Sequence, residues 1–547
     1  MRSATTTIFE TTDLDGASFD YIIVGAGSAG CVLAARLTED PDIRVAVVEA
    51  GGRDNHVWLN MPAGILNLRS SPAFDWGYYS QPIAGCANRT IQWRRGKVLG
   101  GSSSVNGMMY VRGHKLDYDR WASLGLQGWS FAECLPYFKK AEANESKLND
   151  PYHSQNGPLG VCDARGGTPI YGSFINAAKQ AGYAETADFN GEQQEGFGYF
   201  QFNIHAGQRC STARAYMHPS TSRANLTVLI HSHTTRVLFE NKRAVGVEYS
   251  QFGVRKRINA YKEVIVCAGT VNSPQLLKLS GVGPADELTR HEIDVVSDSP
   301  GVGENLQDHF DYLLEHECLT TDTFDVYHNN RIRKAWAGLQ FLLSRSGPGI
   351  SVPLDVGGFL KTDEALAAPD VQLQMLGALL SEDRQTPGFK IHITILRPES
   401  RGRIELGSND PFDAPKIFPN FLACQSDRDT IRAGVRLTRK ILSQPAMDAY
   451  RGRELRPGDG VVTDDDLDRD IAAHGEMDQH CVGTCAMGTQ HPAVVDRHCR
   501  VFGVEGLRVV DASVMPTIIG GNTNAPTIMI AEKIADAIRG APTASSA

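Results

Sequence analysis

The feature that most constrains the fold is a glycine turn between an apolar run, residues 21–24, and a segment with helical periodicity. Gly25, Gly27 and Gly30 form the pattern GxGxxG in this turn. The first glycine permits a tight turn, the second lets the backbone approach a pyrophosphate, and the third allows close packing of helix against strand. Unpaired N–H groups at the helix N-terminus favour an anion there. The pattern predicts a β-α-β unit that binds an adenine dinucleotide.

The second strand of this unit ends at an acidic residue. Glu49 follows the apolar run 43–48 and lies nineteen residues after Gly30. A carboxylate at this position can accept hydrogen bonds from ribose hydroxyls, and a solvated strand-end residue is the alternative. Ala50, the next residue, is included among the expected cofactor contacts. The unit alone does not distinguish FAD from NAD.

Similar α/β patterns return far downstream, at residues 261–281, 506–516 and 525–538. In the first of these a helix is expected to start near Ser273 and Pro274, after a strand. We therefore expect one nucleotide-binding domain assembled from separated pieces of chain. Between them, alternating stretches such as FKIHITILRP and GRIELGS predict a mixed or antiparallel sheet. The stretch SDRDTIRAGVRLTRKILSQ predicts an amphipathic helix capped near Ser426 or Asp427.

Composition limits the partners and the compartment. The chain has 54 Lys and Arg against 63 Asp and Glu, a net charge of −9, and no sustained basic run, so we expect no nucleic-acid partner. No stretch approaches the roughly 20 apolar residues of a membrane span. The N-terminus is expected to be a short polar tail, and residues after Gly540 a short Ala/Ser/Thr tail. Eleven cysteines favour a reducing cytoplasm, with peripheral contact at an inner membrane left open.

The segment RRGKVLGGSSSVNGMMYVRG, residues 94–113, is rich in small and polar residues and poor in bulk. Such a segment can lie flat against a planar ring and donate backbone N–H groups to its polar edge or to phosphates. A flexible surface loop is the alternative.

Four motifs then show a family resemblance: GKVLGGSSSVNGMMYVRG, GTVNSPQLLKLSGVG, GVGENLQDH and DASVMPTIIGGNTNAPTIMIAEKIADAI. They resemble, in family order from about residue 19 to about 538, the glucose–methanol–choline (GMC) oxidoreductases, flavoproteins that use FAD. The match looks nearest to bacterial dehydrogenases of alcohols, polyethylene glycol and choline.

The resemblance implies an α/β fold: a Rossmann-like FAD-binding domain of the glutathione-reductase-like kind, with an inserted α+β substrate domain on a mixed or antiparallel sheet. We assign the FAD-binding domain to 19–160, 205–314 and 471–540, and the substrate domain to 161–204 and 315–470.

The resemblance also places the flavin contacts. Beyond the fingerprint glycines, Glu49 and Ala50, they would fall in five separate stretches of the chain: Ser28, Gly100, Gly101, Ser102, Asn106, Gly107, Met108, Met109, Val237, Ala268, Asp511, Ala512, Asn522 and Thr523. Some relatives tether the flavin through a histidine just before the loop asparagine. Because Val105 stands there and has no nucleophilic nitrogen, we expect FAD to be bound non-covalently.

The stretch MDQHCVGTCAMG, residues 477–488, offers several chemistries. The spacing of Cys481 and Cys485 is admissible for zinc, but no second tight pair follows, so no metal site is expected. A disulfide is disfavoured in a reducing compartment, and nothing in the sequence lowers a thiol pKa. A packed imidazole is the bland interpretation of His480.

The resemblance gives His480 a role. The family's histidine ahead of a VGT triplet lies over the flavin, and a second histidine or an asparagine lies some forty residues on, here Asn522, with Asn524 as the alternative. Alcohol oxidation sends a hydride to flavin N5 and a proton to a base, for which an imidazole is suited at neutral pH. An amide can hold the substrate oxygen without competing for the proton.

The substrate is expected to be a neutral primary alcohol. Choline is the alternative, because Asp311 stands where choline-oxidising relatives have a carboxylate, one methylene longer than this one. The electron acceptor is a quinone, dioxygen or another carrier. A hydroxynitrile lyase, in which the same base works without electron transfer, is a further alternative.

Overall fold

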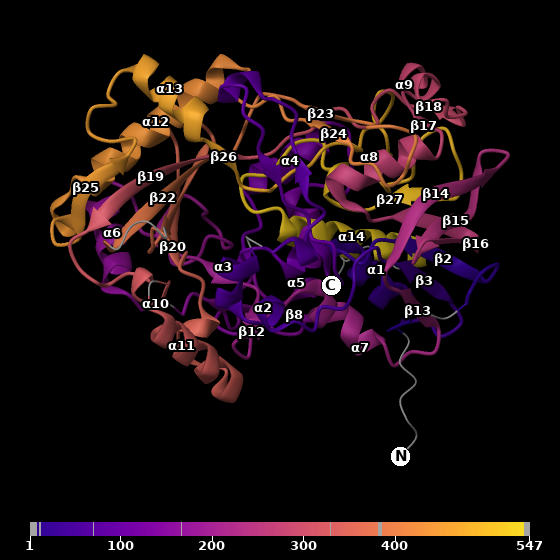
Figure 1. The fold of residues 1–547 in the computed structure, drawn as a ribbon, viewed down its shortest axis with the longest axis horizontal. Helices are drawn as coiled ribbons and strands as arrows, with labels where there is room; N and C mark the ends of the chain where they lie inside the picture. The colour runs from indigo at the N-terminus through magenta and orange to yellow at the C-terminus, as the bar shows by residue number, and fades with distance from the viewer. Residues whose placement is uncertain are drawn as a thin grey trace.

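The computed structural model describes residues 8–9, 13–68, 71–165, 167–328, 330–380 and 386–540. The expected tail after Gly540 lies outside these ranges, as does most of the expected N-terminal tail. Within that N-terminal stretch, however, Ile8–Phe9 form a strand, β1, which pairs with β13 (Leu226–Leu229). Figure 1 shows two lobes, one around each large sheet.

The first lobe is built on a sheet with strand order β1-β13-β3-β2-β16-β15-β14, with β27 beside β16. Its central strands are parallel, and residues 21–24, 45–48 and 264–266 of these strands are buried, which explains their continuous apolar runs. Three of its central strands come from distant parts of the chain, as the sequence predicts. The strands not yet given bounds are β2 (Ser18–Val24), β3 (Val45–Val48), β14 (Ser232–Glu240), β15 (Arg243–Gln251), β16 (Val254–Val266) and β27 (Leu507–Val509).

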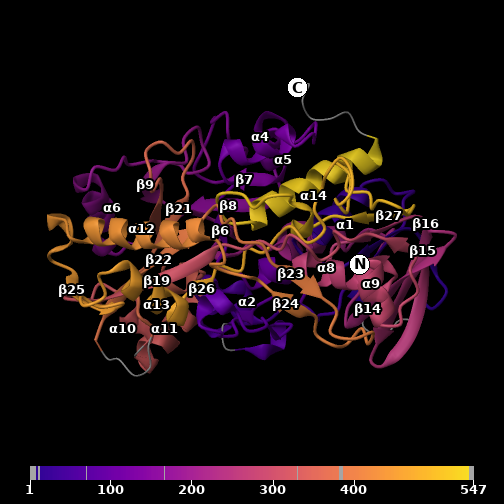
Figure 2. The ribbon, with the colours of Figure 1, turned by 90° about the horizontal axis from the view of Figure 1, so that it is seen from above.

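Helices from both ends of the chain cover this sheet. Helix α1 packs against α14, and α14 also packs against α5, whereas α8 packs beside β14 (Figure 2). The bounds are α1 (Ser28–Leu37), α4 (Lys115–Ser123), α5 (Phe131–Ala141), α7 (His218–Ser220), α8 (Gly269–Leu279), α9 (Ala285–Arg290) and α14 (Asn524–Arg539).

The second lobe is built on a sheet with strand order β25-β19-β22-β21-β20-β9, with β26 beside β19, and its pairings are antiparallel. This confirms the antiparallel sheet expected from the alternating stretches. Helix α12 packs on β22, and α6 on α12. The bounds are β9 (Gly196–Tyr199), β19 (Phe310–Cys318), β20 (Val356–Leu360), β21 (Val371–Leu376), β22 (Gly388–Ile395), β25 (Arg451–Arg456), β26 (Glu476–Met477), α6 (Pro169–Gln180), α12 (Gln425–Leu442) and α13 (Asp464–His474).

Shorter elements lie outside the two large sheets. They include α2 (Val57–Asn60), α3 (Ile65–Leu68), α10 (Asp325–His328), α11 (Arg331–Ser344), the 3₁₀ turns η1 (Pro62–Gly64), η4 (Gly101–Ser104) and η6 (Gly347–Ile350), and the small strands β6 (Met109–Tyr110), β7 (Glu142–Asn144), β8 (Leu159–Asp163), β10 (Gln201–Phe202), β12 (Gln208–Arg209), β23 (Arg403–Glu405) and β24 (Lys416–Phe418).

Two expected helix starts are wrong. Helix α8 begins at Gly269, because Pro274 is accommodated inside the helix and does not start it. Helix α12 begins one residue after Cys424, its N-cap. The carboxylate of Asp427 accepts from the backbone N–H groups of Glu399 and Ser400 (2.8 and 3.0 Å), so it ties the helix to a neighbouring loop.

The division of the chain into domains stays a prediction. Strand β19 belongs to the second sheet and crosses the expected boundary at residues 314 and 315, so this boundary falls inside a strand. In the described part of the chain, no helix is long and apolar enough to cross a membrane.

Candidate active site

A cavity of about 800 Å³ lies between the two lobes. Its walls come from the N-terminal ends of α1 and α14, the loop that follows Arg94, and residues of β19, β22 and β26 from the second sheet. A volume of this size suits a cofactor together with a small substrate.

The end of the cavity at α1 suits a pyrophosphate. Helix α1 has Gly27 as its N-cap and no side chain bonds its first N–H groups. Gly25 has a φ of 97°, and a Cβ on Gly30 would lie 1.9 Å from the carbonyl oxygen of Gly25. Only glycine permits this turn and this close packing of helix on strand. The bare helix end is thus available to an anion.

Glu49 lies buried in the cavity wall beside this helix end. Its two carboxylate oxygens accept from the backbone N–H groups of Ala26 (2.8 Å) and Gly51 (2.7 Å). Burial raises the pKa of the Glu49 carboxyl to about 7. The carboxylate is fixed where a ribose would follow a pyrophosphate on α1, which supports the adenine dinucleotide expectation.

The cavity brings together most of the residues expected from the sequence. Three of them lie outside its lining: Gly30, which packs the helix, Gly100, and Val237, whose N–H donates to the Ser280 hydroxyl. The lining includes Gly25, Gly27, Ser28, Glu49, Ala50, Gly101, Ser102, Asn106, Gly107, Met108, Met109, Ala268, His480, Asp511, Ala512, Asn522 and Thr523. Their individual contacts to a cofactor stay predictions.

A buried arginine supports the loop of residues 99–109 from behind. Arg209 is 2% exposed, and its guanidinium donates to the carbonyl oxygens of Ser103 (3.2 Å), Asn106 (2.6 Å) and Leu59 (2.8 Å). Burial lowers the pKa of Arg209 to about 9. Val105 lines the cavity in this loop, and non-covalent attachment of FAD stays a prediction.

His480 lies at the other end of the cavity, between a histidine and an asparagine. Its Nδ1 is 3.0 Å from Nδ1 of His309, and its Nε2 is 3.0 Å from Nδ2 of Asn522. Asn524, the alternative to Asn522, is engaged elsewhere, because its Oδ1 accepts from the Ser28 hydroxyl at 2.8 Å. The amide beside His480 is therefore Asn522.

This chain of contacts fixes the tautomer of His480. Nε2 of His309 lies 3.1 Å from the carbonyl oxygen of Ile519, which can only accept, so Nε2 carries the proton. Burial lowers the pKa of His309 to about 4, so this ring is neutral and its Nδ1 accepts from Nδ1–H of His480. Nε2 of His480 then keeps its lone pair, and the Asn522 amide donates to it. Nε2 can accept a proton from a substrate once the amide gives up this contact.

Burial and the neighbouring His309 hold the pKa of His480 well below its usual value. The ring is therefore neutral at neutral pH. Its backbone N–H donates to Oδ1 of Asp308 at 2.8 Å, and burial raises the pKa of Asp308 to about 7. Asn522 has a second polar atom, Oδ1, that is buried without a protein partner among the described residues.

Two carboxyl groups lie on the second sheet close to His480. Asp311 on β19 is opposite Thr394 on β22, and the Thr394 hydroxyl lies 3.2 Å from Asp311 Oδ1 and 2.9 Å from Asp478 Oδ2. Nδ1 of His392 lies 2.7 Å from Asp311 Oδ2, and Nδ1 of His480 is 3.9 Å from Asp478 Oδ2. All of these side chains except Thr394 line the cavity.

The Thr394 hydroxyl has one proton and cannot donate to both carboxylates. Burial and the nearby charge of Asp311 raise the pKa of Asp478. A protonated Asp478 that donates to Thr394, which donates in turn to Asp311, satisfies all three groups. Asp478 is then the neutral partner of the pair, and His392 faces Asp311. Asp311, His392 and Asp478 each offer one atom that could ligate a metal ion, and these atoms all lie within 4.8 Å of one another. Among the described residues, no cysteine belongs to this cluster.

The cysteines near His480 are packed in the protein interior. Cys481, Cys485 and Cys499 are buried and unpaired, and burial raises the pKa of each thiol. Arg95 donates to the Cys481 sulfur at 3.1 Å. These thiols are poor nucleophiles.

The residues that the sequence analysis missed are Asp308, His309, His392, Thr394 and Asp478. Asp308 and His309 end the GVGENLQDH motif, and Asp478 lies in the stretch MDQHCVGTCAMG, so these three had a signal. His392 and Thr394 lie in the alternating stretch FKIHITILRP, which carries no functional signal.

Comparison with known proteins identifies the family. Residues 19–311 and 398–531 match the two models that describe the GMC oxidoreductases. This chain is a GMC oxidoreductase. Similar curated proteins are the mitochondrial choline dehydrogenase of Mus musculus, 44% identical over 96% of this chain and 90% of that protein, and the oxygen-dependent choline dehydrogenase of Pseudomonas fluorescens (strain Pf0-1), 46% identical over 95% and 94%. Among solved structures, a formate oxidase variant of Aspergillus oryzae RIB40, studied for FAD modification, has a TM-score of 0.91 and 27% identity, and the match covers 96% of this chain and 99% of that chain.

The resemblance noted from the motifs is thereby confirmed, as are the fold class and the cofactor. The protein is an FAD-dependent oxidoreductase that acts on CH–OH groups. The site fits this cofactor, since the bare end of α1, buried Glu49 and the loop over Arg209 line one continuous cavity that ends at His480.

Proposed function

We propose that this enzyme oxidises choline, or a close cationic analogue, to the aldehyde with His480 as the base. The observation that carries the proposal is the carboxyl pair of Asp311 and Asp478, which lines the cavity beside His480. The relatives named choline dehydrogenases support it as well. Both favour the expected alternative over a neutral primary alcohol.

In this proposal each side chain has one task. Bound FAD supplies the acceptor for the hydride of the carbinol carbon. Nε2 of His480 takes the hydroxyl proton once the Asn522 amide turns from this nitrogen to the substrate oxygen, because the ring is neutral and Nε2 carries no proton. The Asn522 amide holds the substrate oxygen near that nitrogen. Nδ1–H of His480 stays donated to His309 while the ring becomes cationic.

The carboxyl pair selects for charge. A trimethylammonium group cannot donate a conventional hydrogen bond, so a protein recognises it by negative charge and by aromatic faces. The pair supplies the charge. Asp311 is tied to His392 and Thr394, which fix the position of the charge.

The acceptor and the compartment belong to the proposal too. The name of the Pseudomonas relative supports dioxygen as an acceptor, with a quinone or another carrier as the alternatives from sequence. A cytoplasmic location stays a prediction.

The test is an anaerobic stopped-flow panel with choline, benzyl alcohol and straight-chain alcohols, in which loss of the flavin absorbance reports the reductive half-reaction. We expect choline to bleach the flavin fastest. We expect Asp311→Asn to lower kcat/KM for choline by about 10-fold or more and to change the neutral alcohols little. A wild-type preference for neutral alcohols would contradict the substrate proposal, and cyanohydrin cleavage without bleaching would indicate a lyase.

A further inference from the structure

Helix α11 presents an apolar face to solvent. It begins after Asn330, whose side-chain oxygen accepts from the N–H groups of Ile332 (3.0 Å) and Arg333 (3.1 Å), and it ends at the left-handed residue Arg345. Phe341 is its buried anchor, and a Cβ on Gly349 of η6 would lie 2.9 Å from the Phe341 Cβ. The helix is therefore capped at both ends, and it packs against the protein on the side of Phe341.

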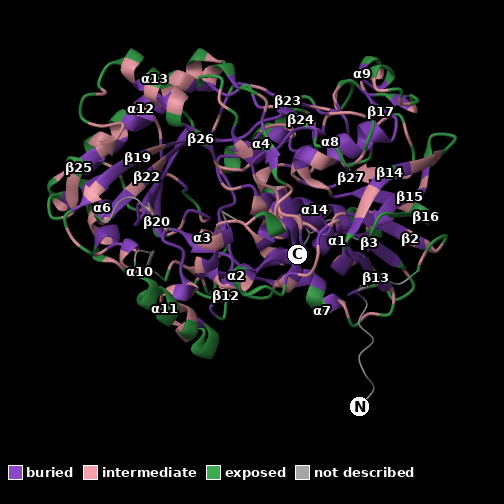
Figure 3. Cartoon of the chain, viewed as in Figure 1, coloured by how far each residue is buried: buried purple, intermediate pink, exposed green. Residues whose placement is uncertain are grey.

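The exposed side of α11 is a stripe of large apolar residues. Ile332, Trp336, Leu339 and Leu343 follow one another at intervals of four, three and four residues, so they lie on one helix face. Ile332 is 82% exposed, Trp336 66% and Leu343 78%. At about 100° per residue, Phe341 lies opposite the centre of this stripe. Figure 3 shows the helix as one of the most exposed elements of the fold.

The charged side chains of the helix that carries the apolar stripe are all basic. Residues 331–345 contain four basic side chains and no acidic one, in a protein of net charge −9. Arg331 and Arg333 flank Ile332 in sequence and fall on opposite sides of the stripe, and Arg345 closes the helix with its guanidinium 4.5 Å from the Phe341 ring centroid. Apolar residues with tryptophan on one face and basic residues beside them are typical of helices that lie in a membrane interface.

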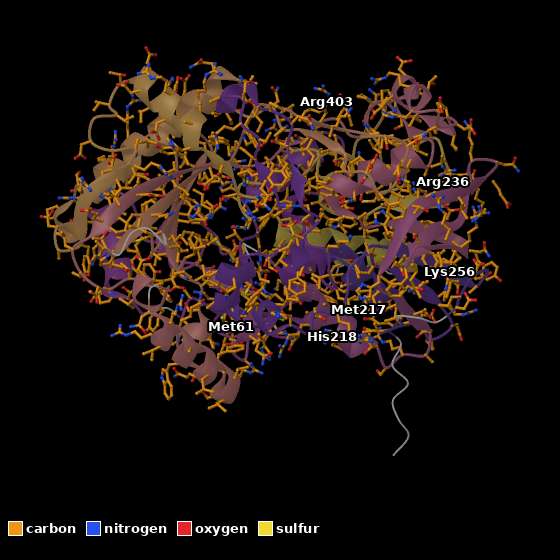
Figure 4. The ribbon with its side chains drawn as sticks, viewed as in Figure 1. Met61, Met217, His218, Arg236, Lys256 and Arg403 are labelled. Atoms are coloured by element: carbon orange, nitrogen blue, oxygen red, sulfur yellow. The ribbon has the colours of Figure 1, made fainter. Side chains whose placement is uncertain are left out.

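A second exposed apolar site lies nearby. Val57 and Trp58 on α2 are 39% and 36% exposed. The turn η6 packs against α11 on one side and against η1, which follows α2, on the other. Met61, labelled in Figure 4, joins them, since its sulfur lies 3.4 Å from the position of a Gly349 Cβ. Figures 1 and 2 both place α2 and α11 on the same side of the molecule.

We propose that α11 lies in the plane of an anionic phospholipid membrane and docks the enzyme there, with Ile332, Trp336, Leu339 and Leu343 among the lipid chains and the basic residues at the headgroups. The charge favours lipid over a second copy of this chain. In a symmetric contact between two copies the basic helix would face the same basic helix, although the whole chain has a net negative charge. A helix of this length lies on the membrane and does not cross it.

The test is flotation of the FAD-loaded, full-length protein with vesicles of phosphatidylcholine alone or of phosphatidylcholine with phosphatidylglycerol. We expect at least about 10-fold more bound protein on the anionic vesicles and release at high salt. Trp336→Ser with Leu343→Ser should reduce binding about 10-fold or more, and Arg331→Gln with Arg333→Gln should remove the preference for anionic lipid.

The matched control replaces equally exposed apolar residues elsewhere: Leu148→Ser with Tyr261→Ser, which are 65% and 69% exposed in the wild type. It should bind like the wild type, and flavin reduction by alcohol should be unchanged in all variants. The proposal is overturned if the wild type stays in the lower fraction with both vesicle types, or if it binds neutral and anionic vesicles equally well. It is also overturned if the control variant loses as much binding as the α11 variant. Sedimentation velocity tests the alternative occupant, a second copy of this chain. A wild-type dimer that dissociates in the α11 variant would show that this face is a contact between copies and would overturn the proposal.

Discussion

Replacing His309 with leucine removes the acceptor of the His480 Nδ1–H and leaves His480 itself in place. The two Nδ1 atoms lie 3.0 Å apart, and His309 is fully buried and neutral. When Nε2 of His480 takes a proton from the substrate, the ring becomes cationic and its bond to His309 becomes charge-assisted. Such a bond is worth about 1.5–3 kcal/mol, against about 0.5–1.5 kcal/mol for the neutral bond of the ground state, so its loss raises the barrier by about 1–1.5 kcal/mol. At about 1.36 kcal/mol per decade of rate, His309→Leu should slow flavin reduction by about 5- to 13-fold.

The assay is anaerobic stopped-flow reduction of the FAD-loaded variant by saturating alcohol. His309→Gln is the matched control, because a glutamine amide can donate to the Ile519 carbonyl and accept from Nδ1–H of His480 in place of the ring. It should recover most of the rate. Since His309 acts through His480, the double variant His309→Leu/His480→Ala should be no slower than His480→Ala alone.

Two results would refute this reasoning. A rate for His309→Leu equal to that of the wild type would mean that the contact does not matter in the proton transfer. Additive losses in the double variant would mean that His309 acts on the reaction by another route.

Three further predictions follow from the same site. His480→Ala should retain FAD and slow its reduction by about 10²–10⁴-fold, measured by the same stopped-flow assay; an unchanged rate would exclude it as the base. The pKa of Asp478 is raised to about 8, so it ionises as pH rises through that value; kcat/KM for choline should rise there, that for a neutral alcohol should not, and Asp478→Asn should remove the rise. The pKa of His309 is lowered to about 4, against about 6.5 in an unfolded chain, so between these values the unfolded state binds more protons. Stability to urea should therefore fall as pH decreases through this window, by about 1.4 kcal/mol per pH unit from this residue, and His309→Gln should show the smaller slope.

Local patterns in the sequence were sufficient for the cofactor side of the molecule. The turn with Gly25, Gly27 and Gly30 depends on backbone conformation and close packing, which residue type controls directly, so strand, turn and helix lie where the pattern predicts them. The starts of α8 and α12 were less predictable. Pro274 fits inside the first, and Asp427 is recruited by a loop that is distant in sequence, so the local cap signal misled.

The sequence by itself determined the family, the FAD fingerprint, and His480 and Asn522 as the pair to examine. Only the tertiary structure decided the protonation of that pair and the charge beside it. His309 and Asp311 lie about 170 residues before His480 and Asp478, and they meet because β26 pairs with β19 in a register that sets Met477 opposite Phe310 and lets the Asp478 N–H donate to the His309 carbonyl. Strand register follows from the side chains of both strands and the layers that cover them, which no local stretch of the chain specifies.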